Sequence, residues 1–109
     1  MADIQPQLQK MVDKFQDPNI QTALKGFTKT LQFSFTDTGE KWLIRVEDGA
    51  KATLAKEALE KPDMTIKTTT DVMAGIIEKR INPQNAYMQR KITIKGSMDD
   101  LFRLQKLLL

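Results

Sequence analysis

Residues 31–49 read LQFSFTDTGEKWLIRVEDG, and this stretch decides the fold class. Every second residue is apolar from Leu31 to Phe35, and again from Trp42 to Val46. A period of two is typical of a β-strand with one buried face. Turn-forming residues, DTG and then DG, follow the two runs. The stretch therefore predicts an antiparallel meander.

Downstream of the meander the local signals conflict. Residues 50–61 are rich in strong helix formers, which favours a helix, whereas the tight turn before them favours a third strand over Lys51–Leu54. Both interpretations stay open on local grounds. Alternation returns at Met64–Thr68, which predicts a further strand. A last alternating strand is predicted for Lys91–Lys95, where Gly96 ends it.

The N-terminal segment predicts a helix over Ile4–Phe15. Its apolar residues recur at the spacing of one helix face: Ile4, Leu8, Met11, Val12 and Phe15. Packing of this face on the core is the favoured interpretation, and contact with a membrane is the alternative. Asp17–Asn19 is predicted to end the helix because proline cannot continue the hydrogen-bond ladder. A short helical turn is expected at Ile20–Leu24.

Three further helices are predicted by their start signals. One begins around Thr68–Asp71, where the threonines offer the N-cap. A second begins at Asn82, with Pro83 at its first position. A third follows Ser97, where acidic residues complement the helix dipole. With the strands, these helices predict an α+β fold, one sheet covered by helices, in a single domain over residues 1–109.

Composition narrows the functional classes. The 109 residues include no cysteine and no histidine, which removes thiol chemistry, the commonest general base and the commonest metal ligands. The five glycines are scattered and form no phosphate-binding loop. Asp99 and Asp100 are adjacent, so on a helix they diverge by about 100° and cannot face one another as an acid–base pair. We therefore expect no enzymatic activity, no metal and no cofactor.

The charge pattern limits the classes of binding partner that can be expected. The net charge of +3 comes from 17 basic and 14 acidic residues that are interspersed along the chain. This differs from the basic stripe of nucleic-acid binders, so no nucleic-acid partner is expected. The densest basic region, Lys79–Lys95, predicts a solvated rim, with transient contact to an anionic membrane surface as the alternative. The polar N-terminus lacks a signal-peptide core, so a cytoplasmic location is expected.

The last third of the chain resembles the sterol carrier protein 2 family. The residues that carry the resemblance are NPQNAYMQ at 82–89, KITIKG at 91–96 and LQKL at 104–107. Supporting segments lie at 42–49 and 62–66. The resemblance covers nearly the whole chain and is loosest in the first helix.

The resemblance implies a five-stranded, mixed, mostly antiparallel sheet covered on one side by about five helices, with an apolar tunnel between sheet and helices. It also implies a strand at Lys51–Leu54, against local propensity. The implied function is a non-enzymatic, monomeric carrier of a fatty acid, acyl-CoA, sterol or phospholipid. Peroxisomal members end in a tripeptide like SKL, whereas this sequence ends Leu107–Leu109, so targeting to peroxisomes by this signal is not expected. Asp99 and Asp100 are charged where members are often small or apolar.

An apolar ligand cavity needs apolar side chains from several elements and a few polar groups. The predicted lining is Phe33, Phe35, Ile44, Val46, Ile66, Met73, Ile76, Ile77, Met88, Phe102, Leu104 and Leu108. Contact with the lipid head group is predicted for Gln89, Arg90 and Gln105. The last helix holds more apolar residues than one buried face needs, so it is predicted to gate the tunnel. For each apolar residue taken alone, ordinary core packing is the simpler interpretation.

One alternative function uses the same fold. A domain with a filled core could serve as a protein-interaction or accessory module of a larger lipid-metabolising system. An enzyme is the weaker rival, because a single tyrosine, Tyr87, is the main proton-donor candidate near basic residues.

Overall fold

The computed structural model describes residues 4–97, 99–100 and 103. A five-stranded sheet with the order β3-β2-β1-β4-β5 forms its base. The strands are β1 (Lys29–Phe35), β2 (Lys41–Glu47), β3 (Lys51–Ala55), β4 (Met64–Thr68) and β5 (Thr93–Lys95). Neighbouring strands are antiparallel except β1 and β4, which are parallel. The mixed, mostly antiparallel sheet is therefore as predicted, although β5 is shorter than the expected Lys91–Lys95.

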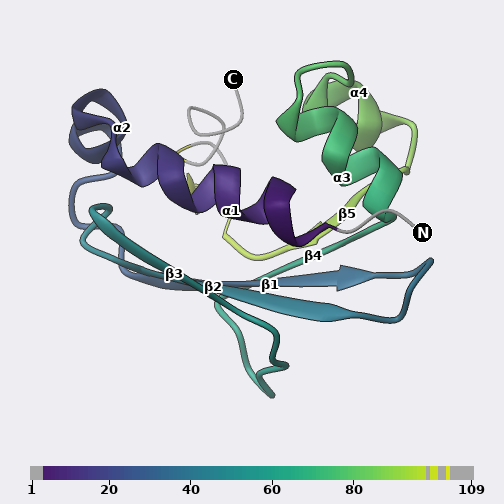
Figure 1. The fold of residues 1–109 in the computed structure, drawn as a ribbon, viewed down its shortest axis with the longest axis horizontal. Helices are drawn as coiled ribbons and strands as arrows, with labels where there is room; N and C mark the ends of the chain where they lie inside the picture. The colour runs from purple at the N-terminus through teal and green to yellow at the C-terminus, as the bar shows by residue number, and fades with distance from the viewer. Residues whose placement is uncertain (1–3, 98, 101–102, 104–109) are drawn as a thin grey trace.

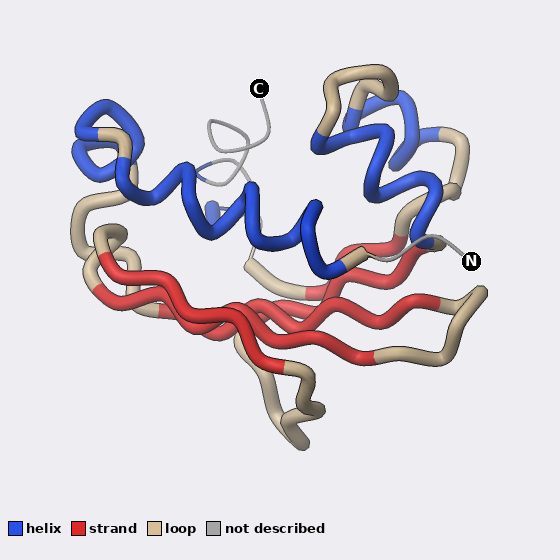
Figure 2. The backbone as a smooth tube through the Cα atoms, in the orientation of Figure 1, coloured by secondary structure: helices blue, strands red, loops and turns tan. Residues whose placement is uncertain are grey.

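The helices lie on one side of this sheet (Figure 1). They are α1 (Gln5–Asp13), α2 (Pro18–Ala23), α3 (Thr70–Ile77) and α4 (Pro83–Met88), and a 3-10 turn, η1 (Lys14–Gln16), continues α1. The number predicted, about five, is corrected to four α-helices for the described residues. The helix predicted after Ser97 falls mostly outside the described residues, and those of its residues that are described, 99, 100 and 103, are helical. Figure 2 shows the same two layers, helices above and strands below.

The predicted meander forms the centre of the sheet. Leu31 pairs with Ile44, and Phe33 with Trp42, in the β1–β2 register. These four side chains belong to one buried cluster on the helix side. Because side chains alternate across a strand, the period of two places them all on that one face.

The ambiguous segment after the meander is a strand. Asp48 and Gly49 have φ angles of 53° and 64°, which a tight type I′ hairpin turn requires. The turn brings β3 back beside β2, from the pair Glu47–Lys51 to the pair Leu43–Ala55. Helix propensity differs among ordinary residues by at most about 0.7 kcal/mol each, and β-pairing overrides it here.

Side-chain caps start α2, α3 and α4. Thr69 accepts a hydrogen bond from the Val72 N–H, and the Asn82 side chain accepts from two N–H groups of α4. The predicted end of the first helix is only partly right. Asp17 does interrupt the helix, but its carboxylate accepts the Asn19 N–H at 2.8 Å, so Pro18 is the first residue of α2. Proline suits this position because the N–H it lacks has no partner in a first turn.

The other face of the sheet is partly covered, which the sequence did not predict. The segment between β3 and β4, residues 56–63, hangs below the sheet (Figure 1). On that face the Gln32 amide donates to the carbonyl oxygens of Trp42 and Glu57, and its oxygen accepts the Leu59 N–H. Leu43, the β2 neighbour of Gln32, is buried beside it. The buried Gln32 thus helps to fix this segment against the sheet, together with the Arg45–Glu57 ion pair and the hydrogen bonds between Thr30 and Asp63.

Candidate functional site

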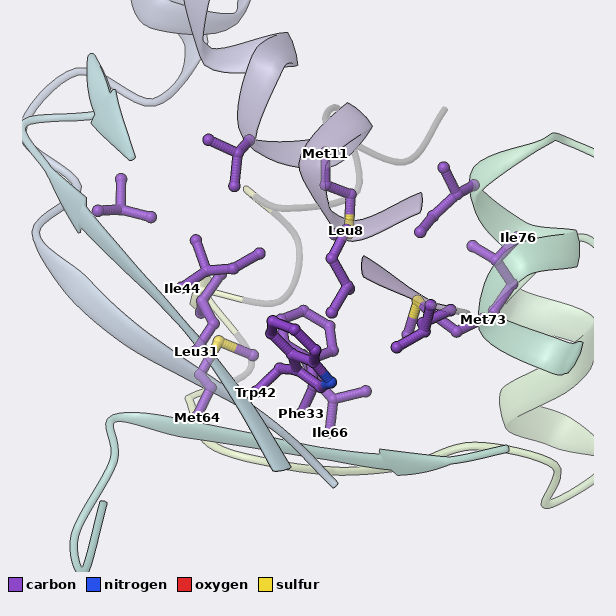
Figure 3. Packing of buried hydrophobic residues seen from close by; sticks show 14 of the residues in the cluster. Leu8, Met11, Leu31, Phe33, Trp42, Ile44, Met64, Ile66, Met73 and Ile76 are labelled. Carbon is purple, nitrogen blue, oxygen red and sulfur yellow. The ribbon is translucent and has the colours of Figure 1, made fainter. Parts of the chain in front are cut away.

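A single apolar cluster fills the space between sheet and helices (Figure 3). Leu8 and Met11 reach into it from α1, and Met73 and Ile76 from α3. The predicted lining residues of the strands and of α3 all belong to it: Phe33, Phe35, Ile44, Val46, Ile66, Met73, Ile76 and Ile77. None of them is more than 8% exposed. The structure therefore brings these residues together in one interior.

The interior also contains residues that were not predicted to line it. On the sheet they are Leu31, Met64 and Trp42, and on α1 they include Leu8 and Met11 (Figure 3). The signal was available, because the strand alternation and the helix-face spacing place these residues with the predicted ones. The rings of Phe33 and Phe35 stack within the cluster, with centroids 6.5 Å apart.

Trp42 adds a polar group to this apolar interior. The side chain is 7% exposed, and Lys56 lies 5.7 Å from the centre of its ring. Its indole nitrogen is buried and makes no hydrogen bond with any described residue. Leaving a buried donor unpaired is unfavourable by about 1–3 kcal/mol. Besides Lys56, the indole also contributes to the lowered pKa of Glu40, so the carboxylate of Glu40 lies close to the Trp42 N–H.

The predicted residues at the end of α4 lie elsewhere. Met88 is 78% exposed, so its prediction as a lining residue is wrong. The helix turns Ala86 toward the core instead, at 1% exposure. Gln89 and Arg90 are also exposed, and the structure does not bring them to the interior cluster. Four other predicted residues lie outside the described part of the chain: Phe102, Leu104, Gln105 and Leu108.

Arg90 belongs to a separate groove of about 440 Å³. The groove lies where β4 ends, α3 begins and β5 starts. It is lined by Thr36, Lys67, Thr68, Thr69, Val72, Arg90, Lys91 and Thr93. Three of these side chains are cationic and four carry hydroxyl groups. We call this site the basic groove.

The shifted carboxyl groups all have structural partners. The Thr70 hydroxyl holds the pKa of Asp37 below its ordinary value. Lys56 lowers the pKa of Glu40 in the same way, through a contact of 2.9 Å. Arg80 lowers the pKa of Glu78. A general acid near pH 7 needs a raised carboxyl pKa, so none of these three carboxyl groups fits that role.

The described residues also lack the features of a metal site and of a membrane span. Within residues 4–97, 99–100 and 103 there is no group of three acidic side chains placed to hold a metal ion. No helix in that part of the chain has the length and apolar character needed to cross a bilayer.

The fold is similar to that of several solved proteins. Palmitated SCP2L2 from Aedes aegypti superposes with a TM-score of 0.74 at 20% sequence identity, over 98% of this chain and 95% of that protein. A stereoselective inverting sec-alkylsulfatase from Pseudomonas sp. superposes with a TM-score of 0.68 at 21% identity. That match covers 81% of this chain but only 14% of the sulfatase. The same fold therefore occurs both alone and within a larger enzyme.

The sequence itself is similar to a known carrier. Sterol carrier protein 2 of Gallus gallus is 32% identical over 66 residues, which make up 61% of this chain and 12% of that protein. The matched segment is thus a small part of that relative. Over nearly the whole chain, residues 8–109 match the family model described as the SCP-2 sterol transfer family. The resemblance carried by residues 82–107 is confirmed, and the chain belongs to the SCP-2 sterol transfer family.

Proposed function

We propose that this chain is a non-enzymatic intracellular carrier that binds a fatty acid, acyl-CoA, sterol or phospholipid between its sheet and helices. The observation that carries the proposal is the apolar cluster of a sterol-transfer family member, which joins α1, α3 and the sheet and contains no charged residue. The palmitated relative from Aedes aegypti has the same fold. The proposed carrier acts as a monomer and contacts membranes only transiently.

Ligand entry requires the helices to move relative to the sheet. The side chains of the interior are buried against one another, so a lipid must displace some of them. Met11, Met64 and Met73 lie in the cluster, and their unbranched side chains re-pack readily around different shapes.

The energetics favour exchange with membranes. Burying an acyl chain of ~16 methylenes is worth ~13 kcal/mol relative to water, at ~0.8 kcal/mol per methylene. A bilayer buries the same chain equally well, so transfer from membrane to protein is nearly balanced. Selectivity must then come from polar contacts of the head group. This balance suits a carrier, which has to release its cargo as well as bind it.

A displacement titration tests the carrier function. Delipidated protein is expected to bind a fluorescent fatty acid saturably, at one probe per chain, and palmitate or cholesterol is expected to displace it. Trp42 emission should shift on binding because the indole lies in the interior. The Trp42→Phe variant should show no such emission change, which would assign the shift to the indole in the interior. If none of these lipids binds saturably, the carrier function is refuted.

The same proposal includes the C-terminal segment as a gate. Arg103 donates a hydrogen bond to the Lys25 carbonyl at 2.7 Å and lies 5.5 Å from the centre of the Phe27 ring, which is in the core. Asp100 lies 3.6 Å from the Lys29 ammonium group. These contacts hold the segment near the junction of α2 and β1. The apolar gate residues themselves, Phe102, Leu104 and Leu108, lie outside the described part of the chain.

Arg103→Ala should open this gate. We expect bound lipid to dissociate roughly fivefold faster or more, because one hydrogen bond and one cation–π contact are lost. The melting temperature should change little, since the hydrogen bond is exposed and Arg103 contacts the buried Phe27 ring only from outside the core cluster. The control is Arg80→Ala, which removes an exposed ion pair with Glu78. Stopped-flow transfer to vesicles measures the rate, and equal rates for both variants would exclude the gate.

A second candidate function is an accessory module. The sulfatase from Pseudomonas sp. contains this fold as 14% of its length, so the fold can serve within a larger protein. Lipid-free native mass spectra after purification, together with a negative titration, would favour this module. A co-purifying lipid would favour the carrier.

A further inference from the structure

The basic groove concentrates positive charge in a hollow. Lys67 comes from β4, and Arg90 and Lys91 follow α4, so separate parts of the chain bring three cations to one place. No carboxylate is among the groove-lining residues. None of the three cations forms an ion pair with any described residue. Concentrated charge of one sign in a concave site attracts ligands of the opposite sign.

Two acidic residues adjoin groove residues along the chain, Asp37 after Thr36 and Asp71 before Val72, and the first of them is already engaged. Asp37 follows the groove residue Thr36, and its carboxylate accepts both the N–H and the hydroxyl of Thr70. Two of the groove hydroxyls are also engaged: Thr68 donates to the Lys91 carbonyl at 2.9 Å, and Thr69 caps α3. The hydroxyls of Thr36 and Thr93 remain as further donors of the groove.

The backbone of Arg90 is unusual. Its φ angle is 60°, in the left-handed region that favours glycine at the end of a helix. Its N–H bonds to the Tyr87 carbonyl at 3.1 Å, and the Lys91 N–H bonds to the Ala86 carbonyl at 2.8 Å. An arginine in this conformation destabilises the fold relative to glycine. Its guanidinium group is therefore positioned at the groove at some expense in stability, as is common at functional sites.

The groove also meets the apolar interior. Val72 lines the groove and packs against the core cluster, in which the next residue, Met73, is buried. A molecule in the groove thus has cationic donors beside it and also contacts Val72, which packs against the apolar interior. This arrangement fits an amphiphile with an anionic head and an apolar tail.

We propose that the basic groove binds the phosphate group of a phosphorylated amphiphile, with its tail directed past Val72 into the interior. The proposal deepens the carrier function and rests on it. A guanidinium group binds two phosphate oxygens at once, and the lysines add charge from either side. The phosphate can belong to a free amphiphile or to a phospholipid in a membrane, and the experiment separates these sources.

The test uses two variants with matched backbone changes. Arg90→Gly removes the cation at a position where glycine is favoured. Lys79→Gly makes the same change at the end of α3, where the backbone has the same geometry. The φ of Lys79 is 65°, its N–H donates to the Ile76 carbonyl at 3.1 Å, and the Arg80 N–H donates to the Gly75 carbonyl at 2.8 Å. Lys79 does not line the groove. Arg90→Asn is a second variant that loses the charge but tolerates the left-handed conformation.

The probes are lysophosphatidic acid and the monoacylglycerol of the same chain length. Arg90→Gly and Arg90→Asn should weaken binding of the phosphate probe about tenfold or more and leave the neutral probe unchanged. Lys79→Gly should change neither affinity. The melting temperature of Arg90→Gly should stay constant or rise. A second experiment measures binding to vesicles that contain 20% phosphatidic acid. If Arg90→Gly weakens binding to the vesicles but not to the soluble phosphate probe, the phosphate belongs to a membrane lipid.

The outcomes separate the two proposals. If Arg90→Gly weakens binding of both probes equally, the phosphate site is refuted and the carrier stands. The same conclusion follows if Arg90→Gly and Lys79→Gly weaken binding of the phosphate probe equally. If the wild-type protein binds neither probe and no vesicle but still binds the fluorescent fatty acid, the phosphate site is refuted and the carrier stands; if it also fails to bind the fatty acid, both proposals are refuted.

Discussion

Gly49→Ala is expected to lower the free energy of unfolding by about 3 kcal/mol or more. An alanine Cβ at this position would lie 2.2 Å from the Leu24 carbonyl oxygen. That oxygen belongs to the backbone and cannot rotate away as a side chain could. The φ of 64° adds strain for any residue with a Cβ. The turn between β2 and β3 would have to separate from the end of α2.

The surrounding contacts explain why this separation is unfavourable. The Gly49 N–H donates to the Phe27 carbonyl at 2.8 Å, and the Asp48 carboxylate accepts the Gly26 N–H at 2.8 Å. Moving the turn would break both bonds. They join the helical layer to the edge of the sheet, so we expect the loss to affect the whole domain.

Gly39→Ala is the matched control. Its φ of 75° imposes the same kind of strain, but nothing lies within 4 Å of the added Cβ. It should therefore lower stability by only about 1 kcal/mol. Urea denaturation of both variants measures the difference. If the two losses are equal, close contact with Leu24 is not the cause.

Gln32→Leu should have the second-largest effect, about 2–3 kcal/mol of unfolding free energy. The side chain is 4% exposed and makes bonds of 2.8 Å to Trp42, 2.9 Å to Glu57 and 2.7 Å to Leu59. Leucine has similar volume but no polar atoms, so these partners must find water instead. The part of the segment around Leu59 should then separate from the sheet, while Asp63 keeps its hydrogen bonds to Thr30.

Hydrogen exchange measures this detachment directly. We expect the Leu59 amide to lose protection in Gln32→Leu, whereas the strand amides of β1 should stay protected. Ser34→Ala, two residues along the same face, is the control and should change stability by less than about 0.5 kcal/mol. Unchanged protection of Leu59 would show that the segment is held by other contacts.

Much of the fold could be predicted because its signals are local. The alternation in residues 31–46 identifies β1, β2 and their buried face, since a strand exposes every second side chain to one side. Asn82 and Thr69 identify helix starts because capping needs a side chain at one fixed position. The same periodicity identified most of the interior, from Phe33 to Ile77.

The amino-acid sequence by itself determined the periods, the caps and the turns, which depend on neighbours within a few residues. Only the tertiary structure decided the state of residues 51–55, where pairing with β2 overrides helix propensity. It also decided that Gln32 is buried under residues 56–63, and that Met88 faces away from the interior. The basic groove has the same origin, because Lys67 and Arg90 are separated by a helix pair and meet only when β5 returns beside β4. Contacts between distant segments have no local period, so they become visible only in the folded chain.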